Sequence, residues 1–197
     1  MPSTETNAAV FFRRAVAALP EMTRTDQRVL LRAPTAQLNR TAVALLQKGS
    51  PALSEWQRGA ALPRCDWGLD FSPSGFDQLV DLFGKMDSLT RLASLQVRLL
   101  FQGNRVAEAV DAIAALILTG RHIGRSGPLI AKVYQLAFES RAVDLAAAQL
   151  LRPGGELPEL LQARLASLPP SGTLKEAVQK EKEFLVQHTR LDLQGAS

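Results

Sequence analysis

The residues best suited to chemistry lie in two short segments. The first, Gly120–Pro128, contains Arg121, His122 and Arg125 and precedes an apolar run that begins at Leu129. In a turn before a helix, unpaired backbone amides and the helix dipole attract anions, and two guanidinium groups would add positive charge. The segment lacks the Gly-Lys-Ser/Thr ending of a phosphate loop and follows no strand. We therefore favour a plain turn between two helices, with anion binding as the alternative.

The second segment is a long loop over residues 64–75, which contains prolines and glycines and has no helical period. Cys65, Asp66 and Trp67 combine a thiol, a carboxylate and an aromatic ring, a set that can line a ligand pocket. A nucleophilic thiolate needs a neighbouring base, and both histidines of the chain are far from Cys65 in sequence. We expect Cys65 and Trp67 to fill a groove between helices, and a ligand-binding loop is the alternative.

Metal-dependent and hydrolytic chemistry find no support in the sequence. His122 has no second histidine or thiol nearby, whereas a metal site needs several ligands. Carboxylate pairs such as Glu108 and Asp111 lack the Glu-x-x-His partner of a di-metal bundle. Ser126 is not part of a Gly-x-Ser-x-Gly elbow. We expect no metal, no cofactor and no catalytic residue.

The composition is that of a folded globular protein. Of its 197 residues, 46% are hydrophobic and 21% are charged. Leu and Ala, which favour helix, dominate the apolar residues. The net charge of +4 comes from scattered arginines rather than from a basic stripe, which argues against nucleic acid as a partner. The single cysteine excludes an internal disulfide.

No apolar run reaches the roughly 18 residues of a membrane-spanning helix, and the first residues lack the apolar core of a signal peptide. We expect a soluble chain whose partner is a protein or a peptide. An upstream signal or anchor, removed from the sequence as given, would change its location. The cellular compartment and the oligomeric state therefore stay open.

Apolar residues repeat at three- and four-residue spacing along most of the chain, which predicts an all-α fold of about eight or nine helices. Serine, threonine, proline and glycine mark the helix ends. The expected helices cover residues 6–19, 25–32, 35–48, 50–62, 76–84, 88–101, 106–117, 129–150, 157–168 and 173–188. We expect Gly84 to kink or end its helix. Neighbouring helices should form antiparallel hairpins, arranged as a repeat-like stack or as an irregular bundle.

These helices are expected to form one domain over residues 1–197. Residues 64–75 form its long internal loop, and residues 171–197 form a more loosely packed C-terminal helix and tail, because charges of alternating sign cover that helix. The central core is expected to comprise the apolar residues Leu92, Leu99, Val110, Ile113, Leu116, Val133 and Leu136.

Two segments follow the pattern of helical repeats. Ala8, Phe12, Ala15 and Pro20 have the spacing of the second helix of a repeat, and Gly103-Asn104 followed by Glu108-Ala109-Val110 matches the turn in the middle of a repeat and the helix after it. They resemble tetratricopeptide (TPR) repeats, in which paired helices stack on their neighbours. The second segment departs from that pattern, with one extra residue before Glu108 and with Arg121 where the repeat ends in proline. The resemblance implies stacked helical hairpins and a protein or peptide partner.

The segments Leu62–Trp67 and Leu118–Arg125 are also similar to those of an uncharacterised bacterial family of helical proteins. That similarity implies helical hairpins and brings no activity with it. We predict a noncatalytic helical module for protein–protein interaction. The alternative is a domain that binds a small ligand or anion, with or without weak enzyme activity, through Arg121, His122 and Arg125 together with the loop segment Cys65–Phe71. A shallow apolar surface would favour the first function, and a deep pocket with converging polar groups the second.

Overall fold

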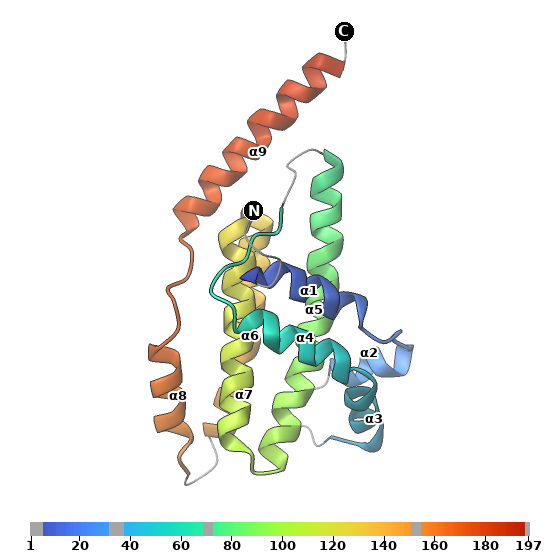
Figure 1. Cartoon of the computed structure of the whole chain (residues 1–197), viewed down its shortest axis with the longest axis vertical. Helices are drawn as coiled ribbons and strands as arrows, with labels where there is room; N and C mark the ends of the chain where they lie inside the picture. The colour runs from blue at the N-terminus through green and yellow to red at the C-terminus, as the bar shows by residue number, and fades with distance from the viewer. Residues whose placement is uncertain (1–5, 32–37, 69–72, 151–154, 196–197) are drawn as a thin grey trace.

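The computed structural model describes residues 6–31, 38–68, 73–150 and 155–195. Within these ranges the chain forms helices α1 (Ala8–Ala17), α2 (Arg24–Leu30), α3 (Arg40–Lys48), α4 (Ser50–Ala60), α5 (Pro73–Gln102), α6 (Val106–Ser126), α7 (Leu129–Leu150), α8 (Leu157–Ala166) and α9 (Leu174–Gly195), and it contains no strand (Figure 1). The prediction of an all-α fold with eight or nine helices is confirmed. None of the helices in these ranges is long and apolar enough to cross a membrane.

Helices α5, α6 and α7 are neighbours at the centre of the fold, and α6 runs antiparallel to the other two (Figure 1). The turn between α5 and α6 contains Asn104, whose φ of 56° lies in the left-handed region that asparagine tolerates. The backbone N–H of Arg105 donates to the carbonyl of Leu100 at 2.9 Å and so satisfies one of the last carbonyls of α5. The hairpin expected at Gly103-Asn104 is therefore confirmed.

The expected end of a helix at Gly84 is wrong, because α5 is continuous from Pro73 to Gln102. A glycine inside a helix costs only about 1 kcal/mol relative to alanine. On either side of Gly84, Phe83 and Met86 are completely buried, and burying each such side chain contributes about 1.5–3 kcal/mol. The burial of its neighbours outweighs the helix-breaking tendency of the glycine.

The expected turn over Gly120–Pro128 is also wrong, because α6 continues as far as Ser126. The glycines in this segment serve helix packing. A Cβ atom added to Gly120 would lie 3.1 Å from the backbone oxygen of Gln135 on α7, and one added to Gly124 would lie 1.8 Å from the Gln135 side-chain oxygen. Gly120 and Gly124 thus allow α6 and α7 to approach closely.

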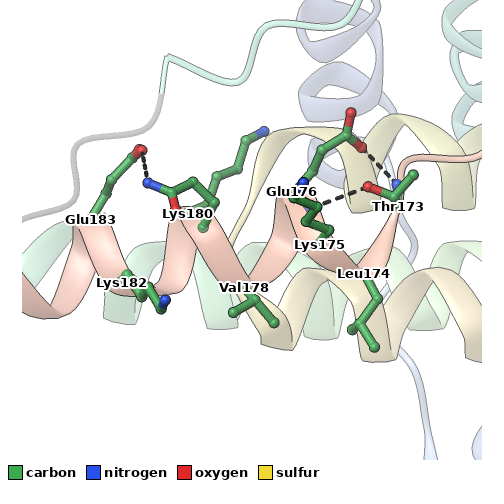
Figure 2. Close-up of a pocket in the computed structure, with 9 residues that line it drawn as sticks. Thr173, Leu174, Lys175, Glu176, Val178, Lys180, Lys182 and Glu183 are labelled. Atoms are coloured by element: carbon green, nitrogen blue, oxygen red, sulfur yellow. Dashed lines mark hydrogen bonds between the residues drawn. The ribbon is translucent and has the colours of Figure 1, made fainter.

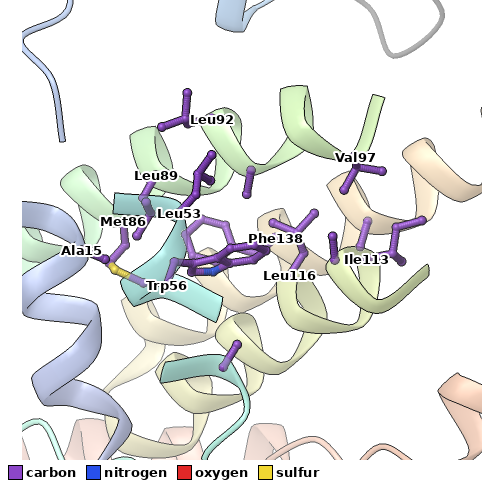
Figure 3. Close-up of a cluster of buried hydrophobic side chains, with 14 of the residues drawn as sticks. Ala15, Leu53, Trp56, Met86, Leu89, Leu92, Val97, Ile113, Leu116 and Phe138 are labelled. Carbon is purple, nitrogen blue, oxygen red and sulfur yellow. The ribbon is translucent and has the colours of Figure 1, made fainter. Parts of the chain in front are cut away.

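The core lies between the long helices and α4. Figure 3 shows Trp56 of α4 among apolar side chains of the neighbouring helices. Trp56 is completely buried, and its indole N–H donates to the Thr119 hydroxyl of α6 at 2.9 Å. Thr119 in turn donates to the carbonyl of Ala115 at 2.7 Å. The polar atom of this large side chain is therefore satisfied inside the core.

Four of the expected core residues are confirmed as buried: Leu92, Val110, Ile113 and Leu116. The other three predictions are wrong, because Leu99, Val133 and Leu136 have exposed fractions of 37%, 60% and 56%. Helix α7 instead packs through the opposite side of its circumference. That buried side comprises Ala131, Gln135, Phe138, Ala142, Leu145 and Gln149.

Local capping explains where α2 and α3 begin. Thr23 and Asp26 form a reciprocal capping box at the start of α2, and Asn39 accepts a hydrogen bond from Ala42 at the start of α3. The expected start of α3 at residue 35 lies outside the described residues. The loop expected over 64–75 is shorter than predicted, because α5 begins at Pro73; residues 69–72 of that loop lie outside the described residues.

Candidate functional site

Residues 62–68 lie along the start of α1, held by backbone and side-chain hydrogen bonds. The amide of Ala8 donates to the carbonyl of Arg64 at 2.9 Å. Asn7 both accepts from the amide of Asp66, at 2.9 Å, and donates to its carbonyl, at 2.8 Å. The side chain of Asp66 turns back to accept from the amide of Gly68 at 2.9 Å. Asp66 is exposed to solvent, and its hydrogen bonds fix the conformation of the loop.

The side chain of Trp67 anchors the same loop to the core. Only 2% of the residue is exposed. Its ring stacks on Phe12 at 5.7 Å between centroids, and Phe83 meets it edge-on at 6.3 Å. Its indole N–H points to the carbonyl of His122 on α6 at 3.4 Å. The structure thus brings Trp67 and His122 together, through the backbone of the histidine and in a packed interior.

His122 is buried, with 4% of the residue exposed, and its ring lies 5.9 Å from that of Phe12. The pKa of His122 is lowered to about 4, mainly by burial and to a smaller extent by the positive charge of Arg125, while a hydrogen bond with the Leu62 backbone acts in the opposite direction. The imidazole is therefore neutral near pH 7. It makes no metal cluster, since no group of three or more His, Cys, Asp or Glu residues converges in the described part of the chain.

Cys65 is partly buried beside α1. Burial raises the pKa of its thiol far above the ordinary value, and the neighbouring charge of Asp66 adds to the rise. The thiol therefore stays protonated, whereas a nucleophilic cysteine needs a lowered pKa. His122, which could have served as the base, contacts Phe12 and the backbone of Leu62.

Arg121 and Arg125 point away from this interior toward the segment between α8 and α9. Arg121 donates to the carbonyl of Pro169, and Arg125 donates to the carbonyl of Pro170. Arg121 also lies 3.5 Å from a carboxylate oxygen of Glu139 on α7. The six candidate residues therefore do not converge on one site. They divide between two sides of the C-terminal end of α6.

Helix α7 contributes two further polar side chains that the sequence reasoning missed. Lys132 donates to the side-chain oxygen of Gln135 at 2.7 Å, to Ser171 at 3.2 Å, and to the carbonyl of Gly172. Gln135, which is completely buried, donates to Ser171 and to Glu139. We call Arg121, Arg125, Lys132 and Gln135, together with the 169–172 backbone and Ser171 that they bind, the linker clasp. The sequence offered one indication of this cluster: Gln135 falls at the three- and four-residue spacing of the buried residues of α7.

The N-terminal end of α7 also has an internal partner. The amide of Leu129, which opens the helix, donates to a carboxylate oxygen of Glu181 on α9 at 2.9 Å. Lys180, one residue earlier on α9, donates to the carbonyl of Arg125 at the end of α6. The position proposed from sequence for a bound anion is thus occupied by a carboxylate of the chain itself.

The outer side of α7 exposes large apolar residues over its whole length. Their exposed fractions are 37% for Leu129, 60% for Val133, 56% for Leu136, 61% for Val143 and 49% for Leu150. We call these five residues the α7 outer face. Four of them recur every seven residues, which places them in one row along the helix.

Helix α9 exposes apolar residues as well, with exposed fractions of 62% for Leu174, 38% for Val178 and 52% for Leu185. A hollow of about 850 Å³ lies along this helix, and all its lining residues come from Thr173–Glu183. Figure 2 shows Leu174 and Val178 projecting on the same side of the helix. A hollow lined by a single helix has no opposing wall, so it is an open surface rather than a ligand pocket.

The comparisons with known proteins found no matching family model, no similar curated protein and no similar solved structure.

Proposed function

We propose that this chain is a noncatalytic helical module that binds a partner protein, and that the α7 outer face is its binding surface. The observation that carries the proposal is the exposure of large apolar side chains in one row along α7. Exposed apolar residues on monomeric proteins are normally scattered, whereas contiguous ones mark interaction sites. The seven-residue spacing of Leu129, Leu136, Val143 and Leu150 is the spacing with which one helix packs along another.

The residues within and beside this row favour a close-packed helical partner. Ser140 and Ala147 are exposed and small, and they alternate with the large residues of the row. Ala137, also exposed, flanks it. Small residues let two helix axes approach closely. Asp144 is an exposed carboxylate beside the row, so the complementary surface is an amphipathic helix with an apolar stripe and a basic residue next to it.

The resemblance of two segments to TPR repeats supports the same function, because helical-repeat arrays bind proteins and peptides through exposed helix surfaces. The alternative function, binding of a small ligand or anion, has less support. Arg121 and Arg125 already bind backbone carbonyls, and the thiol of Cys65 is held protonated. His122 lies in the packed interior.

The test is affinity capture from the native cells with mass-spectrometric identification, using the wild-type chain and a Leu136→Glu, Val143→Glu variant. Both residues are more than half exposed, so the substitutions leave the core intact. Two buried carboxylates in an apolar interface cost several kcal/mol. We expect a protein retained by the wild type to be lost from the variant. A dimer in sedimentation analysis that the variant abolishes would identify the partner as a second copy.

The control is Leu165→Glu, which places one carboxylate on α8, against two in the α7 variant, at a residue with an exposed fraction of 43%. This variant should retain the partner. If the wild type, the α7 variant and the α8 variant capture the same proteins in the same amounts, the α7 outer face is not the binding surface and the proposal is wrong.

A further inference from the structure

Helix α9 contacts the body of the protein mainly through its first half. It contacts α7 and α6, and Figure 1 shows the rest of the helix extending away from the other helices toward the C-terminus. Ala177 is the buried apolar residue of α9 among the described side chains, and Leu174 and Val178 beside it are exposed. Apolar burial therefore contributes little to holding α9 in place.

Polar contacts hold α9 instead. In the linker clasp, Arg121, Arg125 and Lys132 donate to backbone carbonyls of residues 169–172, immediately before the helix. Thr173 and Glu176 then form a capping box that starts it, with hydrogen bonds of 2.6 and 3.2 Å (Figure 2). Lys180 and Glu181 bind the end of α6 and the start of α7. Polar contacts of this kind near solvent contribute little to stability.

These contacts lie at one end of the α7 outer face. Glu181 accepts a hydrogen bond from the amide of Leu129, the first residue of that face. Leu129 has an exposed fraction of 37%, compared with 60% for Val133 one turn later. A helix that packs along the whole α7 outer face must occupy the space beside Leu129, where α9 now lies.

We propose that α9 is an autoinhibitory arm, which in its closed position occupies the space beside the first turn of the α7 outer face and in its open position leaves that space free. Opening breaks the contacts of Lys180 and Glu181 and frees the space beside Leu129. Because the contacts are polar and near solvent, opening requires less free energy than unfolding of the bundle. The part of the inference that concerns partner access rests on the proposed function; the opening itself does not.

The test is hydrogen–deuterium exchange of the full chain at low salt and at about 1 M NaCl, because salt weakens the interaction of the charged Lys180 and Glu181 side chains with the helix ends that they bind. We expect exchange in α9 and in the first turn of α7 to be about fivefold faster at high salt. Exchange at the centre of α6, around the buried residues Ile113 and Leu116, should be unchanged. Glu181→Gln should accelerate exchange in the same two regions at low salt.

Glu183→Gln is the matched control, because Glu183 is exposed on the same helix and pairs only with Gln179 among the described residues, at 3.0 Å. It should leave exchange at the start of α7 unchanged. The inference is wrong if α9 exchanges at the same rate as the core at both salt concentrations, or if Glu183→Gln acts as strongly as Glu181→Gln. No partner enters this experiment, so the capture result with the α7 variant can fail independently of it.

Discussion

Two segments that are distant in sequence dock on the C-terminal end of α6, and they are held by different forces. Residues 62–68 are held on one side by the buried ring of Trp67, which packs against Phe12 and points its indole N–H to the backbone carbonyl of His122. Residues 169–172 are held on the other side by the linker clasp, in which Arg121 and Arg125 bind exposed carbonyls. Burial of apolar surface contributes much more to stability than polar contacts near solvent. The first docking should therefore be part of the folded core, and the second should open separately.

The largest loss of stability is expected from Trp67→Ala, which removes the buried ring that holds residues 62–68 against the core. Removal of a large buried aromatic side chain costs about 3–5 kcal/mol in the free energy of unfolding. Urea denaturation followed by circular dichroism measures this change. Leu174→Ala, at a residue with an exposed fraction of 62%, is the control and should change the free energy by about 0.5 kcal/mol or less. A loss of less than about 1 kcal/mol for Trp67→Ala would show that this docking is also peripheral.

A smaller change in the free energy of unfolding is expected from lowering the pH, through His122, which lies beside Trp67. The pKa of His122 is lowered from 6.5 to about 4 in the folded chain. Below pH 6.5 the unfolded chain therefore binds a proton that the folded chain does not, so stability falls as the pH decreases from 6.5 to about 4. Urea midpoints over this range measure the fall, and His122→Gln should reduce its slope. An identical slope in the variant would contradict the burial of His122.

The smallest effect on global stability is expected from the Arg121→Gln, Arg125→Gln double variant. It weakens the linker clasp, whose contacts are exposed or half-buried, so the free energy of unfolding should fall by about 1 kcal/mol or less. Exchange in α9 should nevertheless become faster. Arg58→Gln, which breaks the exposed pair with Glu55, is the control and should leave α9 unchanged. A fall in the free energy of unfolding as large as that caused by Trp67→Ala would show that the linker clasp is as much a part of the folded core as residues 62–68.

Helix content and most helix positions could be predicted because apolar spacing and capping act locally. Glycine was misread at Gly84 and at Gly120–Gly124, because local propensity favours a turn there while contacts with distant residues favour helix. At Gly124 the deciding contact is the side chain of Gln135, which belongs to the next helix. Such a contact exists only once the helices are packed, so no local pattern indicates it.

The core of α7 was misassigned for a related reason. Apolar residues occur on both sides of this helix, so spacing alone could not decide whether the side with Val133 and Leu136 or the side with Ala131 and Phe138 is buried. The choice depends on the close approach of α6 at Gly120 and Gly124.

The candidate site was misread because neighbours in sequence need not be neighbours in space. Arg121 and His122 were grouped as parts of one turn, but consecutive residues of a helix point about 100° apart. The two side chains therefore contact different segments: Arg121 contacts residues 169–172, and His122 contacts residues 62–68. The approach of Trp67 to His122 spans 55 residues of sequence and depends on the tertiary fold.

The central claim, that the α7 outer face binds a partner protein, is tested most directly by photo-crosslinking in native cells. A photoreactive amino acid replaces Leu136 on α7 in one version of the chain and Leu165 on α8 in another; both positions are exposed, with fractions of 56% and 43%. We predict that irradiation yields a covalent adduct of one discrete mass from position 136 and none from position 165. Equal adducts from both positions, or none from position 136, would contradict the claim.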